Sequence, residues 1–218
     1  KTIENTTQHG RYEDRRPMRQ HFNSRNPADN VRRINDTVST VPIPSGTPAH
    51  DDGIKGHGGC KILQIFCTKD SKYTKGFPLP KLKNFPQSLQ TFIRKVGAPN
   101  VLFTDNALGE TSREVDKICN TYAIEDQHNE PHHQHQNHVE RMIQEIKKNT
   151  TGLMDRTNTQ PQYWLLCTLY VIALMNVMGL QSLDWKTPHE ALFGYKPDIS
   201  PFIAFRWWEL VYFTDPNP

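Results

Sequence analysis

The sequence predicts an α/β fold, because short strands rich in β-branched and aromatic residues alternate with amphipathic segments along the chain. The clearest strand spans residues 61–67, and a short turn joins it to a second strand at 73–79, which is the pattern of a hairpin. Residues 38–43 also favour a strand. Pro42 and Pro44 restrict that strand to a sheet edge or a distorted course, because proline cannot donate to a ladder.

Beyond the hairpin, helices and strands alternate. Residues 85–96 carry apolar side chains at the three-and-four spacing of a one-faced helix. The elements expected after it are a short strand at 101–103, a helix at 112–122, a short strand at 122–124, and helices at 139–154 and 161–180. This order matches a ribonuclease-H-like fold, in which helices flank a mixed five-stranded sheet.

Length and composition allow one domain with poorly ordered ends. The chain has 218 residues, is 35% hydrophobic and contains sixteen prolines, which indicates a modest core. We expect a basic arm at 1–35, which is either solvated or in contact with phosphates, a core at 36–195 and the start of a C-terminal extension at 196–218. The net charge of +3 permits a nucleic-acid partner without arguing for one.

Other features narrow the class of protein. The four cysteines are scattered and contain no Cys-x-x-Cys pair, which argues against a zinc knuckle or a disulfide framework. The longest apolar run, 163–180, is interrupted by polar residues and favours a buried helix, so no membrane partner is expected. No secretion signal is recognisable at the start of the chain.

Two acidic residues carry the main functional signal. Asp105 follows the predicted strand at 101–103, and Glu140 lies in the first turn of the predicted helix at 139–154. The pair resembles the last two members of the Asp/Asp/Glu triad of retroelement integrases. That triad holds two divalent cations about 3.5–4 Å apart for phosphoryl transfer.

Longer strings strengthen this resemblance. They include DSKYTK at 70–75, TDNA at 104–107, EPHHQHQN at 130–137, YWLLC at 163–167 and FRWWE at 205–209. Together they resemble the integrase of copia-type retrotransposons, in particular an algal subgroup of gag-pol polyproteins. The resemblance implies a ribonuclease-H-like core that processes DNA 3′ ends and transfers them into target DNA with Mg²⁺ or Mn²⁺. It also implies a homo-oligomer found in the nucleus and in cytoplasmic virus-like particles.

The resemblance carries metal-ligand roles onto individual residues. Asp105 corresponds to the second metal ligand and Glu140 to the third, whereas the position of the first falls on Val41, which has no oxygen to offer a metal. We therefore expect a two-metal site that is weakened and a copy that is catalytically impaired. Asp36 is a candidate substitute if the strand slips by an odd number of residues, although such a slip turns every side chain to the other face. The loop acids Asp51 and Asp52 are further candidates.

The resemblance also predicts a DNA-contacting surface, formed by the loop at 130–137 and the polar face of the following helix. The predicted contact residues are His133, Gln134, Gln136, Asn137, Gln144, Lys147 and Lys148. Two simpler interpretations stay open: a solvated helix face for the lysines, and a zinc site for the histidines of the loop. The function that the resemblance implies is accordingly that of an impaired integrase, with a non-catalytic DNA-binding or multimerising relic as the alternative.

The aromatic residues at 205–213 have two interpretations of their own. They resemble a platform on which bases stack, but their alternation with other apolar residues favours a strand packed on the core.

Overall fold

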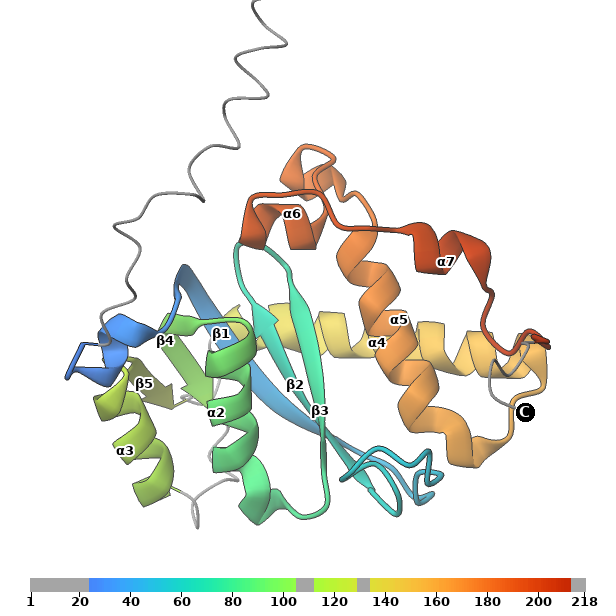
Figure 1. Ribbon diagram of the computed structural model, residues 1–218, viewed down its shortest axis with the longest axis horizontal. Helices are drawn as coiled ribbons and strands as arrows, with labels where there is room; N and C mark the ends of the chain where they lie inside the picture. The colour runs from blue at the N-terminus through green and yellow to red at the C-terminus, as the bar shows by residue number, and fades with distance from the viewer. Residues whose placement is uncertain (1–23, 105–111, 129–133, 213–218) are drawn as a thin grey trace, which may run out of the picture.

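The computed structural model of the protein describes residues 24–104, 112–128 and 134–212, apart from the side chains of residues 112, 128 and 134–138. Its centre is a five-stranded sheet in the order β3-β2-β1-β4-β5 (Figure 1). The strands are β1 (Arg33–Pro44), β2 (Ile62–Thr68), β3 (Thr74–Leu79), β4 (Ala98–Thr104) and β5 (Glu125–His128). The first three are antiparallel neighbours, whereas β4 and β5 run parallel to β1. The predicted mixed sheet of a ribonuclease-H-like fold is confirmed.

Helices cover both faces of the sheet (Figure 1). One face packs against α2 (Phe85–Lys95) and α3 (Ser112–Thr121), and the other against α4 (Gln134–Thr157) and α5 (Trp164–Val177). Two short helices follow, α6 (Pro188–Phe193), which contacts α5, and α7 (Ser200–Ala204). Short 3-10 turns occupy 27–30, 82–84, 161–163 and 181–183.

β1 lies in the middle of the sheet, so the sheet edge, one of the two courses predicted from its prolines, is wrong. The Ser45 amide donates to the Lys61 carbonyl at 2.8 Å, which means that odd-numbered residues near the end of β1 direct their backbone groups at β2. Pro42 and Pro44 therefore turn their nitrogens toward the β4 side. β4 pairs with β1 only as far as Ser39, so the missing N–H groups cost no hydrogen bond of either ladder.

A hydrogen bond joins the start of β1 to the turn that follows α3. β1 begins at Arg33, so residues 33–35 belong to the sheet rather than to the predicted arm. The Arg33 guanidinium donates to the Ala123 carbonyl at 3.1 Å. Ala123 has a φ of 50°, and the Ile124 amide donates to the Cys119 carbonyl, which ends the helix. The strand predicted at 122–124 is therefore a turn, and β5 begins at Glu125.

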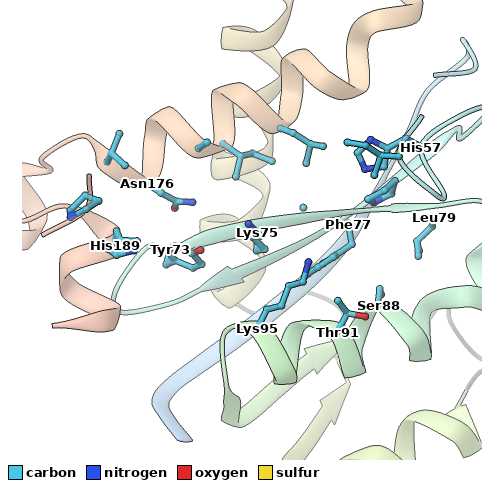
Figure 2. Close-up of a pocket in the computed structure, with 18 of the residues that line it drawn as sticks. His57, Tyr73, Lys75, Phe77, Leu79, Ser88, Thr91, Lys95, Asn176 and His189 are labelled. Atoms are coloured by element: carbon cyan, nitrogen blue, oxygen red, sulfur yellow. The ribbon is translucent and has the colours of Figure 1, made fainter. Parts of the chain in front are cut away.

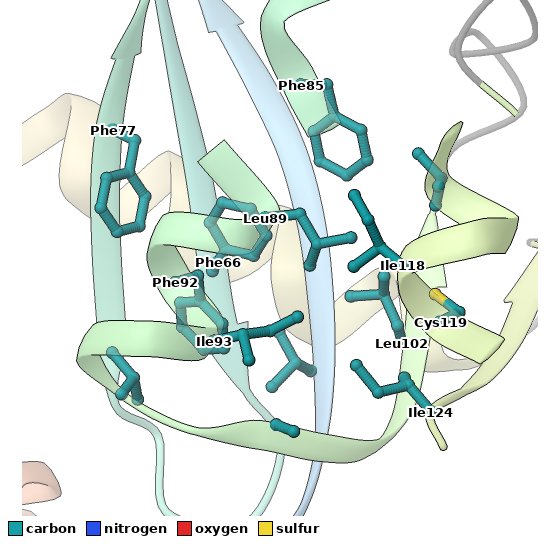
Figure 3. Close-up of a cluster of buried hydrophobic side chains, with 14 of the residues drawn as sticks. Phe66, Phe77, Phe85, Leu89, Phe92, Ile93, Leu102, Ile118, Cys119 and Ile124 are labelled. Carbon is teal, nitrogen blue, oxygen red and sulfur yellow. The ribbon is translucent and has the colours of Figure 1, made fainter. Parts of the chain in front are cut away.

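The core beneath α2 and α3 is centred on Phe66 of β2, whose side chain is fully buried. Its ring stacks on Phe92 with the centroids 4.7 Å apart, lies parallel to Phe85 at 6.1 Å and meets Phe77 edge-on at 5.7 Å (Figure 3). Because four aromatic rings come from two strands and one helix, this cluster joins α2 to the sheet.

α5 explains the longest apolar run of the sequence. The helix spans 164–177, shorter than the predicted 161–180, and a 3-10 turn precedes it. Leu165, Val171 and Ile172 are buried, which accounts for the apolar composition. In the described part of the chain no single helix is long and apolar enough to cross a membrane. Residues 161–177 and 181–193 meet the length and composition of a span only when counted together across a 48° bend.

Candidate functional site

Val41 lies on the face of β1 that packs against α4 and α5. Its partner in β2 is Ile65, which is fully buried, and the half-buried Val41 side chain packs against the same apolar cluster as Ile43 and Met142 of α4. β1 pairs in parallel with β4 up to Ser39, two residues before Val41. The position that the resemblance assigns to the first metal ligand is therefore filled by an apolar side chain in an apolar setting.

Asp36 lies on the opposite face of β1. Buried side chains alternate along the strand, and the even-numbered Ile34 and Val38 join the cluster beneath α2 and α3. The Asp36 carboxylate is buried and accepts hydrogen bonds from the Asp70 amide at 2.9 Å, the Ser71 amide at 2.9 Å and the Ser71 hydroxyl at 2.8 Å. Its side chain holds the β2–β3 turn and, in this register, faces away from Val41.

We expect Asp36→Asn to lower the free energy of unfolding by about 2 kcal/mol, because an amide places N–H donors against donors and removes the charge from a buried acceptor. Urea denaturation measures this change. The same substitution should leave the Mn²⁺ affinity of the protein unchanged. A stable variant with weakened Mn²⁺ binding would show instead that Asp36 serves as the substitute metal ligand.

The two loop acids are held by local contacts. Asp51 accepts the Gly53 amide at 3.1 Å, and Asp52 accepts the Ile54 amide at 3.0 Å and lies 2.8 Å from Nδ1 of His57. Desolvation raises the pKa of Asp52, but the hydrogen bonds from Ile54 and His57 outweigh it and lower that pKa below its ordinary value. Both carboxylates thus stabilise turns of the loop that contains them.

Glu140 and three of the predicted DNA contacts share the solvent-facing side of α4. The side chains of Glu140, Gln144, Lys147 and Lys148 are exposed, whereas Val139, Ile143 and Ile146 on the other side of the helix are buried against the sheet. This side of α4 is therefore a polar face that is open to solvent.

The start of α4 corrects the predicted loop. α4 begins at Gln134, so Gln134, Gln136 and Asn137 are helical, and Glu140 is the seventh residue of the helix rather than part of its first turn. The polar stretch before Val139 gives no apolar periodicity from which its helicity could have been predicted. Asp105 and His133 lie outside the described residues.

The described His, Cys, Asp and Glu side chains bear on both the two-metal and the zinc interpretation. Within residues 24–104, 112–128 and 134–212, wherever side chains are described, no group of three or more His, Cys, Asp or Glu side chains converges. Val41 supplies no ligand atom, and Glu140 is the single described member of the expected triad. The described residues therefore do not fit a complete two-metal site.

The C-terminal aromatic residues pack against the helices. Nε1 of Trp207 donates to the Thr159 hydroxyl at 3.1 Å, and its ring lies 5.4 Å from that of Tyr170. Trp208 lies 4.7 Å from Tyr163. These contacts support packing over a base-stacking platform. However, the segment up to residue 212 is not a strand, because it turns at Trp208, whose φ is 63°.

Comparisons with known proteins rest on structure. No family model and no curated protein matches the sequence. The HTLV-2 integrase catalytic core domain, solved in complex with magnesium in trimeric form, is similar with a TM-score of 0.55 and 15% identity, over 73% of this chain and 97% of that chain. The catalytic core domain of BIV integrase is similar with a TM-score of 0.54 and 13% identity, over 78% and 98%.

A larger assembly is also similar. A chain of the simian T-cell lymphotropic virus intasome, solved in complex with the PP2A regulatory subunit B56 gamma, matches with a TM-score of 0.56 and 16% identity. The match covers 83% of this protein and 62% of that chain, so this protein spans less than two thirds of its length. At these identities the similarity establishes the fold: the protein has the ribonuclease-H-like fold of integrase catalytic cores.

Proposed function

We propose that the protein is the core of a copia-type retrotransposon integrase whose DNA-processing step is impaired. The ribonuclease-H-like fold and the integrase-like strings support the integrase assignment. The observation that carries the impairment is the place of Val41, which lies on the α4 face of the central strand and packs into an apolar cluster. A two-metal site needs a carboxylate oxygen at this position, because hard cations are held by oxygen ligands.

The proposed chemistry is that of the family the sequence resembles: processing of DNA 3′ ends and their transfer into a target duplex. Asp105 and Glu140 are the proposed ligands of Mg²⁺ or Mn²⁺. Glu140 stands at the exposed side of α4, where a cation and DNA have access to it. Because the first ligand is missing, we propose that any metal site is weakened.

The proposed partner is DNA, both element ends and target duplex, bound along the exposed face of α4. Lys147 and Lys148 lie about two turns beyond Glu140, and Gln144 lies about one turn beyond it. The exposed side chains of both lysines are in positions to contact phosphates. His133, Gln134, Gln136 and Asn137 precede them in the sequence and complete the proposed surface. By the same resemblance we propose a homo-oligomer that works in the nucleus and in cytoplasmic virus-like particles.

We expect Lys147→Gln and Lys148→Gln each to weaken duplex binding and to reduce the slope of log affinity against log salt by about 0.9, because each lysine neutralises one phosphate. Fluorescence anisotropy with a labelled duplex at several salt concentrations measures both quantities. Lys117→Gln on α3, on the opposite face of the sheet, is the matched control and should change neither. Equal slopes in all four proteins would show that the lysines form a solvated surface.

The second candidate is a relic that binds DNA or other integrase subunits without catalysis. Val41 favours it as well, since the apolar packing there needs no metal. Sedimentation analysis with and without duplex tests this role. A natural protein that neither self-associates nor binds the duplex would contradict it. A zinc-dependent rise in melting temperature, absent with Mn²⁺, would favour the zinc interpretation of the histidines instead.

A further inference from the structure

A groove of about 790 Å³ runs along the free edge of β3, between α2 and α5 (Figure 2). Its charged side chains are predominantly cationic: Lys55, Lys75 and Lys95 against the single carboxylate of Asp198. The proposed DNA surface on α4 is made of other residues, and none of its described members lines the groove. A ligand of this groove would therefore occupy a separate site.

Lys75 and Lys95 reach the groove from different elements. Lys75 projects from β3 on the same face as Phe77, and Figure 2 shows the Lys95 side chain extending from the end of α2 toward β3. Burial lowers the pKa of Lys75 below its ordinary value, and the neighbouring charge of Lys95 lowers it further. Among the described residues neither ammonium forms an ion pair or hydrogen bond. An anion between the two ammonium groups would offset both the burial of the Lys75 charge and its repulsion by Lys95.

The edge of β3 is closed to an added strand. The Asn176 side chain accepts the Thr74 amide at 2.9 Å and donates to the Thr74 carbonyl at 2.7 Å, which blocks the first outward-facing residue of the strand. Pro78, the last outward-facing residue, has no N–H to donate. Gly76 alone is left with an outward amide, and one amide is too few for strand addition. Side chains must therefore hold the ligand.

The walls of the groove favour a ligand with an apolar part. Phe77, Leu169 and Ile172 line it, and Thr91, whose hydroxyl donates to the Gln87 carbonyl at 2.8 Å, lies on the α2 side (Figure 2). The volume falls in the range of sites that enclose compounds of a few hundred daltons. Two ammonium groups are point charges that match a doubly charged phosphate better than a single carboxylate.

We propose that this groove binds a small compound that carries a dianionic phosphate group on an apolar or aromatic body. Lys75 and Lys95 hold the phosphate from two sides, and the apolar walls receive the body. The site is independent of the proposed integrase activity, because it shares no described residue with α4.

Phenyl phosphate is the probe, and inorganic phosphate and benzoate are its two partial analogues. Titration followed by amide NMR should shift the Gly76 signal, with inorganic phosphate and benzoate each binding at least about tenfold more weakly than phenyl phosphate. Equal affinity for inorganic phosphate would overturn the role of the apolar body. Equal affinity for benzoate would overturn the preference for a dianion.

Variants separate binding from folding. Lys75→Met and Lys95→Gln should each weaken phenyl phosphate binding by about tenfold or more, and Lys117→Gln on α3 should have no effect. Lys75→Met removes a half-buried charge, so it should melt no lower than the natural protein, and its loss of binding would not reflect loss of the fold. Unchanged affinity in both groove variants, or shifts confined to the amides of α4, would overturn the site.

Discussion

Val41→Asp is expected to raise Mn²⁺-dependent nicking and strand transfer on a labelled duplex by several orders of magnitude over the natural protein. Removal of one member of a catalytic set commonly costs that much in rate, so restoring it should recover a comparable factor. The substitution places a carboxylate on the face of β1 that packs against α4, the helix that carries Glu140. β1 also pairs with β4, the strand that precedes Asp105 in the sequence.

Three further proteins give this experiment its controls. Val41→Asn has nearly the same shape as Val41→Asp without the charge and should stay inactive. Glu140→Gln combined with Val41→Asp should abolish any recovered activity. Natural protein that already exceeds Glu140→Gln alone would mean that another acid supplies the missing ligand, and the proposed impairment would be wrong.

Stability gives the same substitution a second readout. A carboxylate beside the apolar cluster of Val41 should lower the free energy of unfolding by about 1–3 kcal/mol in the absence of metal. Mn²⁺ should then raise the melting temperature of Val41→Asp, since a ligand that binds only the folded state stabilises it, and should leave the natural protein nearly unchanged. A folded but inactive Val41→Asp that shows no Mn²⁺ response would favour the non-catalytic relic.

Local patterns predicted most of the elements. The strand at 62–68 is shifted by one residue from the predicted 61–67, and the helix at 85–95 ends one residue before the predicted end at 96. The agreement is close because apolar spacing reports directly on which side chains face the core. The hairpin that β2 forms with β3 was equally predictable, since its turn is short.

The central position of β1 and the role of Asp36 depend on contacts between residues far apart in the sequence, which local patterns do not report. The prolines of β1 suit a central strand only because β4 stops pairing at Ser39, a fact that depends on residues about 60 positions away in the sequence. The structural role of Asp36 has the same origin, because its hydrogen-bond partners lie 34 and 35 residues further on. No nearby residue marks Asp36 as the acceptor of a distant turn.

The candidate site was predicted from resemblance rather than from physical pattern. Glu140, Gln144, Lys147 and Lys148 lie on the exposed face of α4, and their metal and DNA roles stay predictions. The groove beside β3 had no signal of its own, because Lys75 and Lys95 are separated by 20 positions and line one groove only when α2 packs against the hairpin. Charge clusters that assemble across elements are invisible to periodicity.

Phe66→Ala is expected to lower the free energy of unfolding by about 3–5 kcal/mol, a large share of the stability of a domain this size. Phe66 is fully buried, and its ring contacts Phe92, Phe85 and Phe77, so alanine leaves a cavity that α2 and the sheet cannot both collapse into. Urea denaturation followed by tryptophan fluorescence measures the loss.

Phe205→Ala is the matched control for this substitution. It removes the same ring from a side chain that is 52% exposed, so its cost should stay below about 1 kcal/mol. A similar loss in both variants would show that Phe66 is not the centre of the core. A large loss confined to Phe66→Ala would mean that the stacked aromatic cluster, rather than the C-terminal segment, fixes α2 and β3. The groove that holds Lys75 and Lys95 would then depend on Phe66 although Phe66 does not line it.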